Sequence, residues 1–150
     1  MTVRLLFSTT HYPLSLLIRA TTWSRWSHVA LVDGDQVIEA AALEGVRETP
    51  LQEAISRASD YMIVELPARN AAAIIAAARS QLGKPYDWTA IAGLGLHREW
   101  QEDDAWFCSE LIAWAADEAG EAWFREDSLR RVTPQHLWML PPHAALCSAR

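Results

Sequence analysis

The chain has 150 residues, 51% of them hydrophobic, and a formal net charge of −6. This length suits one domain whose core needs no metal or disulfide, so we expect a single domain over residues 1–150. The acidic balance leaves no basic surface for phosphate groups and excludes nucleic acid as the expected partner. The apolar stretch 13–20 contains Arg19 and is too short for a transmembrane segment.

The predicted elements of the first half are mostly strands. An apolar strand pattern at 2–8 is followed by a helix at 13–22 that begins with Pro13. Two strands joined by a turn at Gly34 and Asp35 come next, a further stretch could extend this meander, and a helix precedes the last strand. These elements are expected at 28–33, 36–40, 43–50, 51–58 and 61–66.

The second half is mostly helical. A helix capped by Asn70 is expected to run to about Leu82. Another is expected at 107–119, after a long connection over 84–106, and a short helix over 134–140 is the last predicted element. Strands first and helices afterwards indicate an α+β fold with an antiparallel sheet.

The hairpin brings two polar side chains onto one face. With the turn at 34–35, Ala30 faces Glu39, so His28 and Glu39 are diagonal neighbours. A carboxylate bonded to one nitrogen of an imidazole fixes its tautomer and supports the imidazolium that forms when the other nitrogen takes a proton. The alternative is an ordinary hairpin, with a half-buried histidine whose hydrogen bonds are satisfied and a solvated glutamate.

Cys108 falls in the first turn of the predicted helix 107–119. The positive end of the helix dipole favours the thiolate there, which is the nucleophilic form of cysteine. Cys108 also continues the apolar stripe of Leu111, Ile112 and Ala115, so a buried structural cysteine fits the same spacing.

Tyr86 lies in the segment LGKPYDW, where Gly83 ends a helix and Pro85 stiffens the chain. A phenol held at this point could donate a hydrogen bond to a developing oxyanion. The alternative is a tyrosine of the turn that packs on Trp88.

The segments GKPYDW and WFCSELI, in this order, resemble the signature of NlpC-type cysteine peptidases, a papain-like superfamily. In its ordinary members the histidine follows the cysteine, where this chain has His136 and His143. The segments WSHVALV and VIEA instead precede the cysteine. That order resembles the circularly permuted branch, which contains YiiX-like proteins and relatives of lecithin retinol acyltransferase, and the resemblance covers residues 15–120.

This resemblance implies an antiparallel sheet packed against the helix that carries the cysteine. It makes Cys108 the nucleophile, His28 the general base, Glu39 the residue that orients the base and Tyr86 an oxyanion contact. Glu110 competes with Glu39 as the third residue of the triad.

Three functions remain open at this point. The leading one is a cysteine hydrolase that cleaves an amide bond, as an amidase or small peptidase. The second is an acyltransferase or thioesterase that uses the same Cys-His pair on lipid-like acyl groups. The third is a non-catalytic protein, such as a phage-encoded assembly component, that keeps the fold.

No cofactor is expected for any of these functions. A zinc site at His11 and His28 is not predicted, because no ligand spacing supports it. No signal peptide is recognised, so we expect a cytoplasmic protein in which Cys108 and Cys147 are free thiols. The oligomeric state is left open.

Overall fold

A computed structural model describes residues 1–89, 92, 105–141 and 146–147 of the chain. Within these residues, six strands form one antiparallel sheet in the order β4-β3-β2-β1-β5-β6. The strands are β1 (Thr2–Thr9), β2 (His28–Asp33), β3 (Gln36–Ala41), β4 (Gly45–Pro50), β5 (Asp60–Pro67) and β6 (Leu146–Cys147). The helices are α1 (Pro13–Thr22), α2 (Leu51–Arg57), α3 (Ala71–Arg79), α5 (Cys108–Glu118), η1 (Glu126–Arg131) and α6 (Pro134–Trp138).

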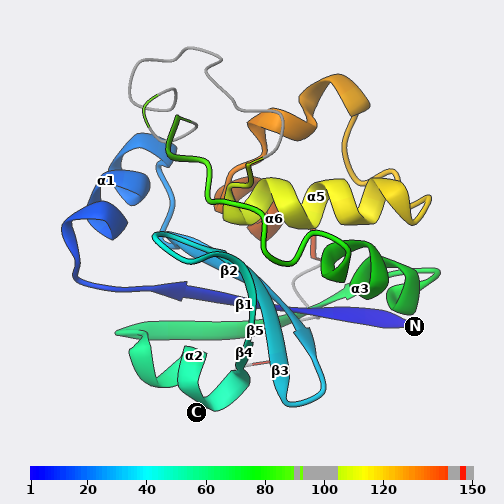
Figure 1. Ribbon diagram of the computed structural model, residues 1–150, viewed down its shortest axis with the longest axis horizontal. Coiled ribbons are helices and arrows are strands. Elements are labelled where there is room, and N and C mark those ends of the chain that lie inside the picture. The colour runs from blue at the N-terminus through cyan, green and yellow to red at the C-terminus, as the bar shows by residue number, and fades with distance from the viewer. Residues whose placement is uncertain (90–91, 93–104, 142–145, 148–150) are drawn as a thin grey trace.

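The helices cover both faces of the sheet. Figure 1 shows α3 and α5 on one face and α2 on the other, with α1 at the side. The predicted α+β class with an antiparallel sheet is therefore confirmed. None of the helices in the described part of the chain is long and apolar enough to cross a membrane.

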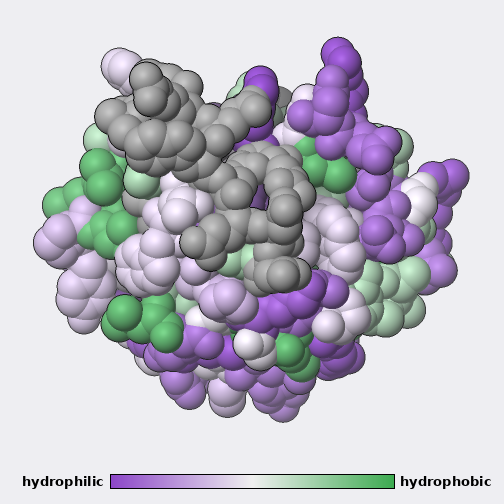
Figure 2. Space-filling view, turned by 45° about the horizontal axis from the view of Figure 1, so that its top comes forward, coloured by the Kyte–Doolittle hydropathy of each residue, from purple (hydrophilic) through white to green (hydrophobic). Residues whose placement is uncertain are grey.

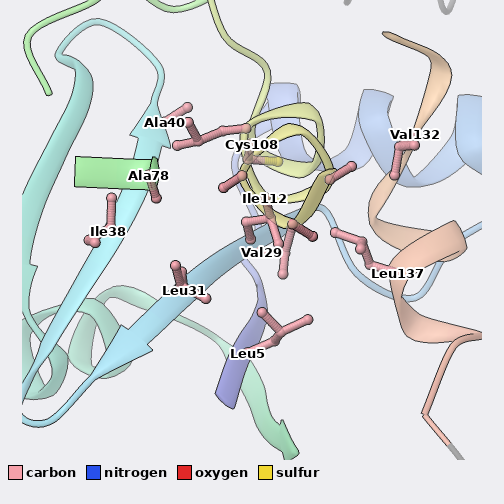
Figure 3. Close-up of a cluster of buried hydrophobic side chains, with 14 of the residues drawn as sticks. Leu5, Val29, Leu31, Ile38, Ala40, Ala78, Cys108, Ile112, Val132 and Leu137 are labelled. Atoms are coloured by element: carbon pink, nitrogen blue, oxygen red, sulfur yellow. The ribbon is translucent and has the colours of Figure 1, made fainter. Parts of the chain in front are cut away.

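The larger core lies between the sheet and α5. Figure 3 shows Leu5, Val29 and Leu31 of the sheet beside Ile112 of α5, with Leu137 of α6 at their side. All five are essentially inaccessible to solvent, and each such side chain contributes about 1.5–3 kcal/mol by leaving water. This packing fixes α5 against the sheet.

Alternation along the strands assigns the other residues to the second face. Leu6, Ala30, Val32 and Val37 are buried there with Ala54 of α2. Because side chains alternate along a strand, His28 and Glu39 share this face with Ala30 and Val37.

The β2–β3 hairpin has the predicted register. Asp33 pairs with Gln36, and Leu31 pairs with Ile38. Gly34 supplies the positive φ of 59° that a tight two-residue turn needs. The expected diagonal placement of His28 and Glu39 follows from this register.

Two helix ends differ from the predicted ones by more than one residue. The helix expected to reach about Leu82 ends at Arg79, because the following turn leaves the helix to bond with β4. The backbone N–H of Gly83 donates to the Val46 carbonyl at 2.9 Å, and the Val46 N–H donates to the Lys84 carbonyl at 2.8 Å. The last helix, expected to reach Leu140, ends at Trp138.

Candidate active site

His28 and Glu39 are in direct contact. The Nε2 atom of His28, the first residue of β2, lies 2.7 Å from Oε2 of Glu39 on β3. The histidine side chain is 26% exposed and the glutamate side chain only 4%. One ring nitrogen of His28 is thus held by a buried carboxylate.

The second oxygen of Glu39 faces cations. Its Oε1 accepts hydrogen bonds from Arg47 Nε and Nη2 at 3.1 and 3.0 Å, from Arg57 Nη2 at 3.0 Å and from Thr49 Oγ1 at 3.4 Å. Burial opposes ionisation of Glu39, but the hydrogen bonds and charges of His28 and Arg57 hold its pKa well below the usual range. Glu39 is therefore a carboxylate over the whole neutral pH range.

Cys108 is the first residue of α5 and is almost fully buried, with 1% of its surface exposed. The preceding residue, Phe107, occupies the N-cap with an extended backbone and makes no side-chain cap. The backbone N–H groups of the first helical turn have no partner within the helix, so they point their positive end toward the thiol. Figure 3 shows Ala40, the neighbour of Glu39 in the chain, beside Cys108.

His28 connects Cys108 to Glu39. Burial of the ring opposes its protonation, but hydrogen bonds to Cys108 and Glu39 and the negative charges of both outweigh this and raise the pKa of His28 to about 10. Because Nε2 is bonded to Glu39, Nδ1 is the ring nitrogen that remains for Cys108. At neutral pH the imidazole is therefore an imidazolium beside the Glu39 carboxylate.

Tyr86 lies against the beginning of α5. It forms a parallel β-bridge with Trp106, and its ring contacts Phe107 with centroids 6.1 Å apart. Its ring also contacts Trp88 edge-on, as expected for a tyrosine of the turn that packs on this tryptophan. Burial, followed by the charge of Cys108, raises the pKa of Tyr86, so its phenol stays protonated and able to donate.

A close backbone approach positions the segment that carries Tyr86. The turn after α3 pairs with Val46 through the two hydrogen bonds described above. Gly45 makes this possible, because its φ is +77° and a Cβ at this position would lie 2.3 Å from the carbonyl oxygen of Lys84. A local glycine thus sets the distance between β4 and the Tyr86 segment.

A pocket of about 530 Å³ lies beside part of this site. His28, Glu39 and Tyr86 line it together with apolar side chains of α1 and α2, among them Leu14, Ile18 and Ala54. Figure 2 shows hydrophobic side chains gathered at the left of the molecule, over α1, where Leu16 and Leu17 are about half exposed.

The structure assigns other positions to the competing residues. Glu110 is buried in the first turn of α5, where its charge helps to raise the pKa of Tyr86, and the carboxylate bonded to His28 is that of Glu39. His136 forms a capping box with Thr133 at the start of α6. His143 lies outside the described residues.

The arginines around Glu39 were not predicted from the sequence. Arg47 lies directly opposite Glu39 in the β3–β4 ladder, so pairing the stretch 43–50 with the strand before it could have indicated that contact. Arg57 reaches Glu39 from α2, which no strand register could indicate. Among the described residues, no group of three or more His, Cys, Asp or Glu side chains is placed to hold a metal ion.

The antiparallel sheet packs against a helix that begins with a cysteine, and the strand that carries the histidine comes before this helix in the chain. This arrangement defines a permuted papain-like protein. The family model described as permuted papain-like amidase enzyme, YaeF/YiiX, C92 family matches residues 4–138, and the chain belongs to this family. The resemblance inferred from the ordered motifs is thereby confirmed. Membership makes the protein, in general terms, an amidase- or peptidase-like cysteine hydrolase.

A solved structure shows the same fold. It is the metalloprotein YiiX from Escherichia coli O157:H7, which is 21% identical in sequence and superposes with a TM-score of 0.72. The match covers 100% of this chain and 96% of that one. No curated protein sequence matches the chain significantly.

Proposed function

We propose that the protein cleaves an amide bond of a small peptide or related amide through a Cys108–His28–Glu39 triad. The observation that carries the proposal is the position of His28, whose Nε2 lies 2.7 Å from the buried Glu39 carboxylate and whose pKa is raised by the neighbouring Cys108. The family supports the general class of cysteine hydrolase, and the geometry supports these residue roles.

The first step is attack by the Cys108 thiolate on the amide carbonyl carbon. A carbon–sulfur bond forms while the π electrons of the carbonyl move to its oxygen. The protonated phenol of Tyr86 and the backbone N–H of Cys108, in the first turn of α5, are the two donors for this oxyanion. Both donors are held in place before the substrate arrives, so their hydrogen bonds require little reorganisation.

The second step is collapse of the tetrahedral intermediate. The imidazolium of His28 gives its proton to the amide nitrogen, the carbon–nitrogen bond breaks and the amine leaves. A water molecule then loses a proton to His28 and attacks the thioester. The carbon–sulfur bond breaks, which releases a carboxylic acid and restores the thiolate–imidazolium pair.

Thiol reactivity tests the pair without knowledge of the substrate. We expect iodoacetamide at neutral pH to alkylate Cys108 at least about tenfold faster than Cys147, as measured by peptide mass spectrometry. His28→Ala should slow the alkylation of Cys108, because the thiolate loses its imidazolium partner. Equal labelling of both thiols contradicts the proposal, as does an unchanged alkylation rate of Cys108 in His28→Ala. Either result favours a non-catalytic protein that keeps the fold.

The pocket favours a second candidate, acyl transfer or thioester hydrolysis on lipid-like acyl groups. Its apolar side chains from α1 and α2 suit a hydrocarbon chain better than a polar peptide. The two candidates differ in the bond cleaved. Acetyl and octanoyl p-nitroanilides compared with thioesters of the same two acids separate them: turnover of anilides supports the amidase, and turnover confined to octanoyl thioesters supports the second candidate.

A further inference from the structure

Glu39 is a buried carboxylate with two separate tasks. Its Oε2 meets His28, while its Oε1 accepts hydrogen bonds from Arg47 and Arg57. A carboxylate that is 4% exposed has lost most of its water, and such a group keeps its charge only where cations or donors replace that water. His28 alone bonds one oxygen, so the arginines provide the charge compensation for the other.

The two arginines approach Glu39 from different elements. Arg47 projects from β4, is 23% exposed and is itself held by Glu44 through Nη1 at 2.9 Å. Arg57 is the last residue of α2, is 43% exposed and donates from Nε to the Glu53 carbonyl at 3.4 Å. Each guanidinium thus has a second partner that directs it, and Glu39 is restrained from two sides.

This restraint acts on the histidine through the carboxylate. Glu39 supports the imidazolium only while it is ionised and while Oε2 points at the ring. Without the charge of Arg57, burial favours the protonated acid, which holds an imidazolium poorly. The loss of imidazolium then removes the partner that stabilises the Cys108 thiolate.

We propose that Arg47 and Arg57 are positioning residues that keep Glu39 charged and aimed at His28, and that they thereby set the lowest pH at which Cys108 is reactive. The inference rests on the function proposed above and adds two residues to the proposed triad. The arginines act through Glu39 and need no contact with the substrate.

The charged and titratable groups that surround the pair come from every element packed against it. Cys108 faces His28 from α5, Glu39 from β3, and Tyr86 lies beside the cysteine. Arg47 on β4 and Arg57 on α2 face Glu39, and Glu44 pairs with Arg47. Of these groups, the two arginines carry a charge that no experimental pH removes.

The test is the pH dependence of Cys108 alkylation by iodoacetamide, in a Cys147→Ser background that leaves one thiol. Arg57→Met removes the charge, Arg57→Lys keeps it, and Arg79→Met is the matched control. Arg79 is equally exposed, at 42%, and forms similar ion pairs with Asp33 and Glu48. Thermal unfolding by circular dichroism verifies that each variant is folded, and Arg57→Gln replaces Arg57→Met if the latter is not.

We expect the acid limb of the rate profile to move to higher pH by about 0.5–1 unit in Arg57→Met, and further in Arg47→Met/Arg57→Met. Arg57→Lys and Arg79→Met should keep the wild-type limb. The inference is overturned if Arg57→Met leaves the acid limb unchanged. It is also overturned if Arg57→Lys shifts the limb as far as Arg57→Met does, because the effect would then not depend on the positive charge. If Cys108 of the His28→Asn variant is alkylated at the wild-type rate, the proposed function itself is overturned.

Discussion

Glu39→Gln should destabilise the folded protein well beyond an ordinary surface substitution. The variant keeps the shape of the side chain but removes the one negative charge that His28, Arg47 and Arg57 share. Removing one partner of a buried ion pair costs about 3–5 kcal/mol. The two arginines are 23% and 43% exposed and can regain water, so we expect the lower end, about 3 kcal/mol.

The loss should also depend on pH with a definite sign. The pKa of Glu39 is lower in the folded protein than its ordinary value of 4.5, so its stabilisation is fully present above that value and is lost as the pH falls through the folded pKa. Urea unfolding at pH 5.5 measures the full difference, because His28 is then protonated in the folded and the unfolded chain alike. At pH 3.5 the difference from wild type should be smaller.

Glu48→Gln is the control for this measurement. Glu48 pairs with Arg79 at 2.7 Å, but both side chains are about one third exposed or more, so its loss should cost at most about 1 kcal/mol. A Glu39→Gln variant that loses no more than this control at pH 5.5, or whose loss is the same at both pH values, would refute the reasoning on the buried carboxylate.

Three further predictions follow from the geometry. Gly45→Ala should lower the free energy of unfolding by about 1–3 kcal/mol, because the residue has a positive φ and its Cβ would collide with the Lys84 carbonyl. Gly34→Ala should cost less, because a Cβ there meets open space, and equal urea midpoints of the two variants would contradict this. Leu137→Ala should cost about 2–5 kcal/mol in the same assay, and a loss under 1 kcal/mol would mean that its site collapses. Tyr86→Phe should lower kcat on an amide substrate about 100-fold with little change in KM, and an unchanged kcat excludes the phenol as oxyanion donor.

The strands and the hairpin could be predicted because their signals are local. Two apolar runs joined by the turn at Gly34 and Asp35 placed β2 and β3 in the register that the structure shows, which put His28 and Glu39 on one face. The helix predicted to reach about Leu82 ends at Arg79 instead, and the turn that follows it pairs with Val46 through Gly83 and Lys84. Propensity along the chain carries no information on that pairing.

The sequence by itself indicated the candidate site residues and determined how the nearby ones face one another. It supplied the ordered motifs around His28, Glu39, Tyr86 and Cys108, and turn chemistry settled the hairpin. These features depend on spacing within a few residues, where covalent geometry limits the choices.

Only the tertiary structure decided which distant groups meet and in what charge state. Arg57 follows Glu39 by 18 residues and reaches it only because α2 packs against the same face of the sheet. Cys108 comes near His28 only because the first residue of α5 packs against the end of the sheet beside Ala40. The hydrophobic effect that drives this packing is not directional. The sequence pattern therefore shows that both faces of the sheet will be covered, but not which helix covers which part of a face. The ionisation of Glu39 and His28 depends on the resulting burial and on these partners, and therefore belongs to the folded structure alone.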